Sequence, residues 1–416
     1  MLLIGLDLLP GQEGLPADPR SYAAKPGFDK RYVPTPSPRL GSACDRPGRL
    51  VYPTAVTEPE RLEDRNVTAV TPLVAPRTVK NALPASAEAA TRVRTTRAAI
   101  RDILHGRDQR RLLVVVGPCS IHDPRAAVEY AERLAPLAAA HADVLVMVMR
   151  TYFEKPRTTV GWKGLINDPT LDGSCDVSAG LELARRLLLD VNRVGVACGC
   201  ELLDPITPQY VADLVAWASI GARTTESQTH REMASGLSMP VGYKNGTDGN
   251  VQVALDAMES ARHPHSFVGI DVDGVTSVVR TQGNPDGHLV LRGGRAASNH
   301  RPADIERAVT LARSQGIARP VMIDCSHGNS GKDPRRQQAV CREVLARLDE
   351  VGPSLMGLLL ESHLSEGRQD WAPGATLRYG VSITDACMGW DDTARLLDDI
   401  AAAVRARPAR RASGSA

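Results

Sequence analysis

The sequence predicts an α/β fold: a (β/α)₈ barrel with an N-terminal arm and a β-hairpin inserted before the sixth barrel strand. Eight short apolar runs, rich in β-branched residues, recur along the chain. Most of them are followed by a helical pattern of apolar residues, an alternation typical of parallel α/β folds. Each run also ends at or near a polar or metal-binding side chain, as expected where parallel strands open onto one functional face.

The length and composition agree with one large barrel. The chain has 416 residues, 43% of them hydrophobic, which is enough for a full core. Its formal net charge of +2 gives no basic field of the kind that binds nucleic acid or a membrane surface. Eight irregularly spaced cysteines indicate free thiols of a reducing compartment, and residues 1–9 lack a basic segment and are too few to span a bilayer. We therefore expect a cytoplasmic protein.

The chain divides into an extension, an arm, the barrel and a tail. Residues 1–63 are rich in Pro, Gly, Arg and Asp without sustained periodicity, and we expect a poorly ordered extension there. Residues 64–110 form the N-terminal arm, in which 86–105 have helical spacing. We expect residues 111–405 to form the barrel and the basic residues 406–416 to form a flexible tail.

The barrel strands are predicted from the apolar runs. After the first strand, Asp123 and Pro124 supply an N-cap and a first-turn proline for a helix. Thr207 and Pro208 begin the helix behind the third strand, and residues 303–315 and 335–350 have helical spacing. The eight predicted strands are 113–116, 144–150, 194–201, 218–223, 240–244, 288–292, 320–327 and 355–361.

One segment interrupts the alternation before the sixth strand. Residues 266–287 contain two β-like runs around Asp271-Val-Asp-Gly274. We interpret this segment as an inserted β-hairpin with a regulatory role.

Cys119 follows the first strand, which ends at Gly117 and Pro118. The strand alone leaves three interpretations open: a core thiol, a nucleophile activated by His122, or a soft metal ligand. The other strand ends favour the metal ligand, because the carboxyl ends of parallel strands meet at one mouth. His122 lies in the loop that leads into the next helix, whereas His327 is the last residue of the predicted seventh strand.

A metal site is predicted where the end of the first strand meets strand ends and turns from late in the chain. Thiolate, imidazole and carboxylate ligands together suit a divalent transition ion such as Mn²⁺, Fe²⁺, Co²⁺ or Zn²⁺. The ligands are far apart in sequence, so this prediction depends on the barrel. Its members are Cys119, His327, Glu361 and Asp385.

A second set of strand-end residues is cationic. Guanidinium groups match phosphate and carboxylate oxygens bidentately, and so many cations at one mouth would repel one another without an anionic ligand. We expect the mouth to bind more than one phosphate or carboxylate group. Lys244 leaves a Schiff-base aldolase open as the chemical alternative. The set comprises Arg150, Lys155, Arg157, Arg223, Lys244 and Arg292, with Glu201 among them.

Long motifs in this chain resemble those of a known family. From about Asp64 to Arg405 the chain is similar to the type I class of 3-deoxy-D-arabino-heptulosonate 7-phosphate (DAHP) synthase, the feedback-regulated enzymes that open the shikimate pathway to chorismate and the aromatic amino acids. The resemblance implies a metal-dependent condensation of phosphoenolpyruvate with erythrose 4-phosphate and water on a (β/α)₈ barrel. The motifs are Gly117-Pro-Cys-Ser-Ile-His-Asp123, Tyr152-Phe-Glu-Lys-Pro-Arg-Thr-Thr-Val-Gly-Trp-Lys-Gly164, Gly221-Ala-Arg-Thr-Thr-Glu-Ser-Gln228, Lys244-Asn-Gly-Thr-Asp-Gly249, Leu291-Arg-Gly-Gly294 and Ser382-Ile-Thr-Asp-Ala-Cys387.

The resemblance implies roles for residues that match these motifs. The metal ligands are matched by Cys119, His327, Glu361 and Asp385. The phosphoenolpyruvate-binding residues are matched by Arg150, Lys155, Glu201, Arg223, Lys244 and Arg292, and the erythrose 4-phosphate loop by Lys155, Arg157 and Thr158. Of these, Cys119, Lys155 and His327 are expected to take part in the chemistry.

The resemblance also implies regulation and assembly. Pro208, Ser238 and Phe267 match effector-pocket positions, so an aromatic amino acid is the implied effector. Two features depart from the family: the extension before Asp64, and Asp271-Val-Asp-Gly274 in place of a Thr-Lys-Trp-Gly-like turn. The implied partners are phosphorylated small molecules and further copies of the chain, in a homodimer or homotetramer. A non-catalytic amino-acid sensor on the same barrel is the remaining alternative, and loss of a ligand or phosphate-binding cation would favour it.

Overall fold

The structure is a computed structural model that describes residues 62–157, 159–372 and 374–407. The chain divides into two units at Pro72. In the first, the described residues 62–72 contain a turn in which the Val67 N–H donates to the Asp64 carbonyl oxygen over 3.1 Å. The predicted extension (1–63) and tail (406–416) lie mostly outside the described residues.

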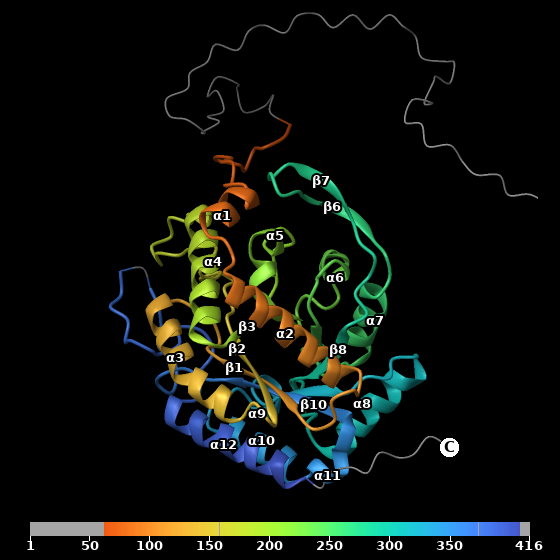
Figure 1. The fold of residues 1–416 in the computed structure, drawn as a ribbon. Helices are drawn as coiled ribbons and strands as arrows, with labels where there is room; N and C mark the ends of the chain where they lie inside the picture. The colour runs from red at the N-terminus through yellow and green to blue at the C-terminus, as the bar shows by residue number, and fades with distance from the viewer. Residues whose placement is uncertain (1–61, 158, 373, 408–416) are drawn as a thin grey trace, which may run out of the picture. The chain divides into compact units, whose positions relative to one another are not determined.

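The second unit contains a closed barrel of parallel strands in the order β1-β10-β9-β8-β5-β4-β3-β2. This confirms the predicted (β/α)₈ fold, and Figure 1 shows the helices arranged around the strands. The barrel strands are β1 (Leu112–Gly117), β2 (Leu145–Arg150), β3 (Ala197–Glu201), β4 (Val215–Ile220), β5 (Val241–Lys244), β8 (Gly287–Leu291), β9 (Val321–Asp324) and β10 (Leu355–Glu361). The helices after the barrel begins are α3 (Pro124–Ala140), α4 (Val177–Val194), α5 (Pro208–Val211), α6 (Gln228–Ser235), α7 (Gln252–Ala261), α8 (Pro302–Ser314), α9 (His327–Ser330), α10 (Arg336–Leu345), α11 (Leu348–Val351) and α12 (Trp390–Ala406), with 3₁₀ turns at Ala212–Leu214 and Gly352–Ser354.

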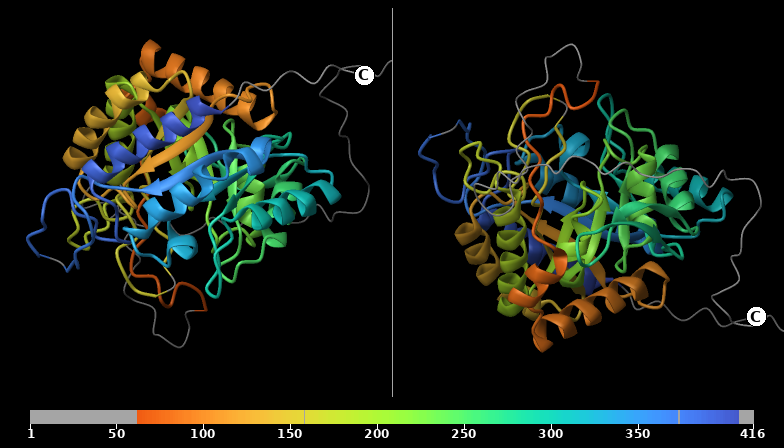
Figure 2. Two further views of the ribbon diagram at one scale, coloured as in Figure 1. Left: turned by 90° about the horizontal axis from the view of Figure 1, so that it is seen from below. Right: turned by 90° about the horizontal axis from the view of Figure 1, so that it is seen from above.

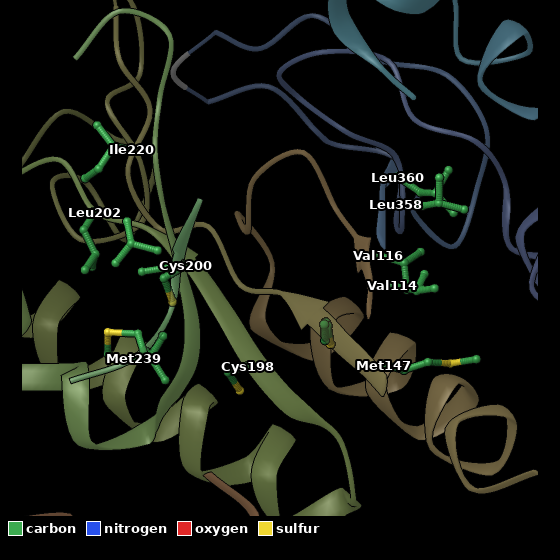
Figure 3. Packing of buried hydrophobic residues seen from close by; sticks show 14 of the residues in the cluster. Val114, Val116, Met147, Cys198, Cys200, Leu202, Ile220, Met239, Leu358 and Leu360 are labelled. Atoms are coloured by element: carbon green, nitrogen blue, oxygen red, sulfur yellow. The ribbon is translucent and has the colours of Figure 1, made fainter. Parts of the chain in front are cut away.

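The strands are apolar on both faces because each face packs against a different partner. In β1, Val114 and Val116 belong to the outer core shared with the helices, together with Leu358 and Leu360 of the neighbouring β10. These side chains lie together in Figure 3. Val115, which lies between them and points to the other face of the strand, belongs to a second cluster that fills the barrel interior. A continuous apolar run, without alternation, is the pattern expected of a parallel strand buried in this way.

Helix α2 (Ala87–Leu104) closes the amino-terminal end of the barrel. Ile100, Ile103 and Leu104 join the interior cluster. Arg97 donates to the carbonyl oxygens of Ala212 and Val215 over 2.6 and 2.7 Å, just where β4 begins. The helix was predicted at 86–105, and the Ser86 side chain caps it by accepting the Ala89 N–H. The arm therefore completes the core of the barrel.

The inserted hairpin is confirmed. Strands β6 (Ser266–Ile270) and β7 (Thr276–Arg280) pair in antiparallel fashion between α7 and β8. Figure 1 shows the pair extending toward α1 (Pro76–Ala82), an unpredicted short helix of the arm. There Arg77 makes a bidentate ion pair with Asp273 over 2.6 and 3.1 Å, and its N–H donates to the Val272 carbonyl.

Several predicted boundaries were wrong. The third strand begins at Ala197, because residues through Val194 continue the unpredicted helix α4 and Gly195, at φ 127, ends it. The fourth strand is Val215–Ile220 and ends before Arg223, since Gly221 begins a turn. The seventh ends at Asp324, and the helix predicted over 335–350 is divided into α10 and α11. The Asp123 cap of α3 is correct, with the Arg125 N–H donating to it over 2.9 Å.

Figure 2 gives two further views, in which the orange helix α2 lies along one side of the barrel. None of the described helices is both long and apolar enough to cross a membrane.

We expect Ile100→Ala to lower the free energy of unfolding by about 2–5 kcal/mol, because it leaves a cavity where α2 closes the barrel. The measurement is urea unfolding followed by circular dichroism. Thr91→Ala, at an exposed position of the same helix, is the matched control. Equal effects of the two substitutions would show that α2 does not contribute a core residue there.

Candidate functional site

The carboxyl ends of the barrel strands carry the predicted site residues. Arg150, Glu201, Lys244 and Glu361 are the last residues of β2, β3, β5 and β10. Cys119, Arg223, Arg292 and His327 follow β1, β4, β8 and β9 by one to three residues. The closed barrel brings these ends to one mouth although the residues are spread along the whole domain.

Three of the four predicted metal ligands form one group. The ligand atoms of Cys119, Glu361 and Asp385 all lie within 4.8 Å of one another. His327 is adjacent but outside this group, with Nε2 3.7 Å from Glu361 Oε1. Cys119 and Glu361 are buried, whereas Asp385 is partly exposed. A thiol and two carboxylates at this spacing are suited to hold a divalent transition ion.

The Cys119 thiol has a lysine partner. Lys155 Nζ donates to Cys119 Sγ over 3.1 Å and to the Cys119 carbonyl over 3.3 Å. Burial and the Glu361 carboxylate raise the pKa of Cys119, while Lys155 opposes them. Among the described residues His122 Nδ1 is buried without a hydrogen-bond partner, and no hydrogen bond joins it to Cys119. The His122-activated nucleophile therefore has no support from the geometry.

Glu361 is the most deeply embedded carboxylate of the site. It accepts from Arg150 Nη2 over 3.0 Å and from Ser326 Oγ over 2.9 Å. Burial alone would raise the pKa of Glu361, but the positive charges of His327, Arg150 and Lys155 lower it to about 2. The carboxylate is therefore held in its ionised, ligating form.

Asp324 was not predicted as a site residue, but it contacts two residues that were, His327 and Lys244. Its Oδ2 lies 2.9 Å from His327 Nδ1 and 3.2 Å from Lys244 Nζ. Burial tends to raise the pKa of Asp324, but His327 and Lys244 lower it strongly. The contact with His327 Nδ1 leaves Nε2 directed to the Glu361 side. The only sequence signal was its place at the end of the seventh apolar run.

Lys244 is arranged as a cation. Burial tends to lower the pKa of Lys244, but Asp324 and Glu201 raise it above its ordinary value overall. An amine must be neutral to attack a carbonyl, so this environment disfavours the Schiff-base alternative.

Arg150 is buried behind the mouth. Its guanidinium lies over the Tyr152 ring, 3.9 Å from the centroid, and donates to the Pro118 and Cys119 carbonyls. Among the described residues its Nη1 is buried without a hydrogen-bond partner. Arg150 therefore has one free donor group, while the rest of its guanidinium holds Glu361 and the Cys119 loop.

One cavity contains most of the predicted cations. Thr158 lies outside the described residues, and Lys332, Thr247 and Thr384 were not predicted. The cavity is lined by Lys155, Pro156, Arg157, Glu201, Gly221, Ala222, Arg223, Lys244, Thr247, Arg292, His327, Lys332, Thr384 and Asp385. The metal-ligand candidate Asp385 and the cation set thus share one pocket.

Glu154 is another residue that the sequence did not single out. Its buried carboxyl accepts the N–H groups of Leu203 and Asp204, over 3.4 and 3.2 Å, and the Thr207 hydroxyl. It thereby connects the loop carrying Lys155 to the loop after β3. Burial raises the pKa of Glu154 to about 8.

The three predicted effector-pocket residues lie on separate elements. Pro208 is buried at the start of α5, Ser238 is exposed before β5, and Phe267 is half-buried on β6. Arg101 of α2 donates to the Ser238 carbonyl over 2.8 Å.

The fold and the site together define a (β/α)₈ barrel protein whose mouth is lined with cations beside a group suited to hold a metal ion. A profile of the DAHP synthetase I family matches residues 82–398. The chain belongs to this family.

Its relatives match over nearly their whole length. The phospho-2-dehydro-3-deoxyheptonate aldolase, Tyr-sensitive, of Escherichia coli (strain K12) is 53% identical over 342 residues, which are 82% of this chain and 96% of the relative. The Phe-sensitive protein of the same organism is 50% identical over 347 residues, 83% of this chain and 98% of the relative. The solved structure of phospho-2-dehydro-3-deoxyheptonate aldolase from Francisella tularensis SCHU S4 matches with a TM-score of 0.80 and 43% identity, covering 83% of this chain and 100% of that one.

The raised pKa of Glu154 predicts a pH dependence of stability. The pKa is about 8 in the folded state and 4.5 as the ordinary value, so the stabilising contribution is complete below about pH 4.5 and is lost as the pH rises through 8. We expect the free energy of unfolding of the wild type to fall, relative to Glu154→Gln, by more than about 1 kcal/mol between pH 5 and 8. Parallel urea titrations across this range measure the difference. A constant difference would mean that Glu154 is ionised in the folded protein.

Proposed function

We propose that this chain is a metal-dependent DAHP synthase that condenses phosphoenolpyruvate with erythrose 4-phosphate and water, giving DAHP and phosphate. The observation that carries the proposal is the Cys119, Glu361 and Asp385 group opening onto a pocket lined with cations. Both substrates are phosphorylated, and one also carries a carboxylate. Family membership and the names of the relatives support the same reaction.

The residues at the mouth divide the binding of phosphoenolpyruvate between them. Arg223 and Arg292 line the same cavity, and burial, followed by the positive charge of Arg223, lowers the pKa of Arg292. Two adjacent guanidinium groups suit one phosphate, since each offers paired N–H donors. Lys244, held by Asp324, faces the same cavity and suits the carboxylate. We assign these three residues to phosphoenolpyruvate.

The donor set fits a divalent transition ion, which Cys119, Glu361 and Asp385 would hold, with the adjacent His327 as the fourth candidate ligand. When bound, such an ion supplies Lewis-acid polarisation of the aldehyde oxygen. Lys155 donates to Cys119 Sγ and keeps its own proton: burial would lower the pKa of Lys155, but Cys119, Glu361 and Glu201 raise it.

We assign these residues to the bond changes of the proposed reaction. The methylene carbon of phosphoenolpyruvate forms a bond to the aldehyde carbon, and the Lys155 ammonium stabilises negative charge that develops on the aldehyde oxygen. Water adds to the former enol carbon, and one of its protons goes to the former aldehyde oxygen. The carbon–oxygen bond to phosphate then breaks, and the phosphate leaves with the other proton. Arg223 and Arg292 hold the departing anion throughout. The cations of the mouth thus keep phosphoenolpyruvate and erythrose 4-phosphate oriented during the reaction.

Removal of the metal should abolish the reaction. We expect a strong chelator to stop heptulosonate formation, divalent ions to restore it, and Cys119→Ser to lower activity at least about 100-fold by removing the soft ligand. Activity is measured as heptulosonate formed, and bound metal by elemental analysis. Cys175→Ser, at an exposed thiol, is the matched control and should retain both activity and metal. Full activity in the presence of the chelator would contradict the proposal.

We also propose that an aromatic amino acid inhibits the enzyme at the hairpin side of the barrel, supported by the Tyr-sensitive and Phe-sensitive names of the relatives. We expect Phe or Tyr, added singly, to lower the initial rate, and Phe267→Ala to raise the inhibition constant about tenfold through loss of an aromatic contact. Val268→Ala is the control, because Val268 is 74% exposed on the opposite face of β6. Inhibition that survives Phe267→Ala unchanged would place the effector elsewhere.

A further inference from the structure

Lys332 is a cation of the pocket to which neither the motifs nor the resemblance gives a role. It follows α9 and lines the same cavity as Arg157, Arg223 and Arg292. Its side chain is 58% exposed, and Nζ lies 3.6 Å from Asp385 Oδ1, beyond hydrogen-bond distance. Within the described part of the chain no hydrogen bond is formed by its ammonium. Lys332 therefore presents three free donors at the opening of the pocket.

The backbone fixes Lys332 in this place. Gly331 and Lys332 have φ values of 62 and 64, and the Lys332 N–H donates to the His327 carbonyl over 2.8 Å. The left-handed region is unfavourable for a lysine, and residues held there cluster at ligand-binding sites. His327, at φ 53, lies in the same tight segment. The position of Lys332 is thus coupled to that of a predicted metal ligand.

The cations of the pocket fall into two groups. Arg223 and Arg292, which follow β4 and β8, are the pair assigned above to the phosphate of phosphoenolpyruvate. Arg157 and Lys332 are both exposed, and they lie on the loops after β2 and β9. These loops flank β1 and β10, which carry Cys119 and Glu361. A second anion at the opening would thus contact Arg157 on one side of the metal-ligand group and Lys332 on the other.

We propose that Lys332 binds the phosphate of the phosphorylated aldehyde, together with Arg157. This assignment rests on the proposed function, because it takes the second substrate to be erythrose 4-phosphate. The Lys332 ammonium lies at the opening of the pocket, on the side of Asp385. A substrate whose phosphate binds there can direct its aldehyde inward, toward Cys119 and Glu361. The alternative role for Lys332 is to neutralise Asp385, which would act on the metal and not on the phosphate.

The test is Lys332→Met, which removes the charge and keeps an unbranched side chain in the same backbone conformation. We expect the KM for erythrose 4-phosphate to rise about tenfold, as for the loss of one charge-assisted contact, with the KM for phosphoenolpyruvate changed less than about twofold. Calorimetric titration with erythritol 4-phosphate, which has no aldehyde to react, should show the same weakening. Lys332→Arg should recover most of the affinity. Arg335→Met is the matched control: Arg335 is exposed on the same loop, pairs with Glu366 over 2.6 Å and lies outside the cavity lining.

Two further measurements separate the possible outcomes. The affinity for Co²⁺, followed by the thiolate–cobalt absorption, should be the same in the wild type and Lys332→Met. A changed Co²⁺ affinity with an unchanged KM for erythrose 4-phosphate would overturn the assignment and place Lys332 at the metal ligand instead. A wild type that forms no heptulosonate would refute the proposed function, whereas the erythritol 4-phosphate titration would still judge Lys332 by itself.

Discussion

The buried carboxylate of Glu361 connects the fold to the candidate site. A buried charge is costly unless every part of it is paired, and Glu361 receives Arg150 from β2 and Ser326 from the loop after β9. Its backbone is held as well, because Gln337 of α10 accepts its N–H and donates to its carbonyl, over 2.8 and 3.0 Å. Strands and helices on both sides of β10 must therefore be in place before this carboxylate is stable. The same contacts set its position beside Cys119.

Charge compensation extends from Glu361 through the rest of the mouth. Lys155 is paired with Cys119, and Lys244 with Asp324. In each pair the lysine suits an anionic substrate. Its partner is either a candidate metal ligand, Cys119, or a residue that contacts one, Asp324. Binding on one side of such a pair changes the field felt on the other, since the interactions take place in a poorly solvated pocket. The arrangement is well matched to a reaction that brings a metal ion and two phosphorylated molecules together.

The elements outside the barrel hold this mouth from both ends. Helix α2 closes the amino-terminal end through apolar contacts and through arginines that satisfy backbone carbonyls. At the other end, Glu154 connects the Lys155 loop to the loop leading into α5. The hairpin contacts α1 through the exposed Arg77–Asp273 ion pair and through a hydrogen bond from the Arg77 backbone N–H to the Val272 carbonyl.

The sequence by itself determined the barrel, the hairpin, the cap at Asp123 and the membership of most of the mouth, because apolar periodicity, turn chemistry and long motifs are local signals. The predicted start of the third strand was wrong, because the apolar residues before Gly195 fit the buried face of a helix as well as they fit a strand. Only the tertiary structure decided that Arg150 is buried against Glu361, that Asp324 joins His327 to Lys244, and that Lys332 reaches the pocket. The physical reason is that each of these contacts depends on which strand ends become neighbours when the barrel closes. Periodicity along the chain does not encode that information.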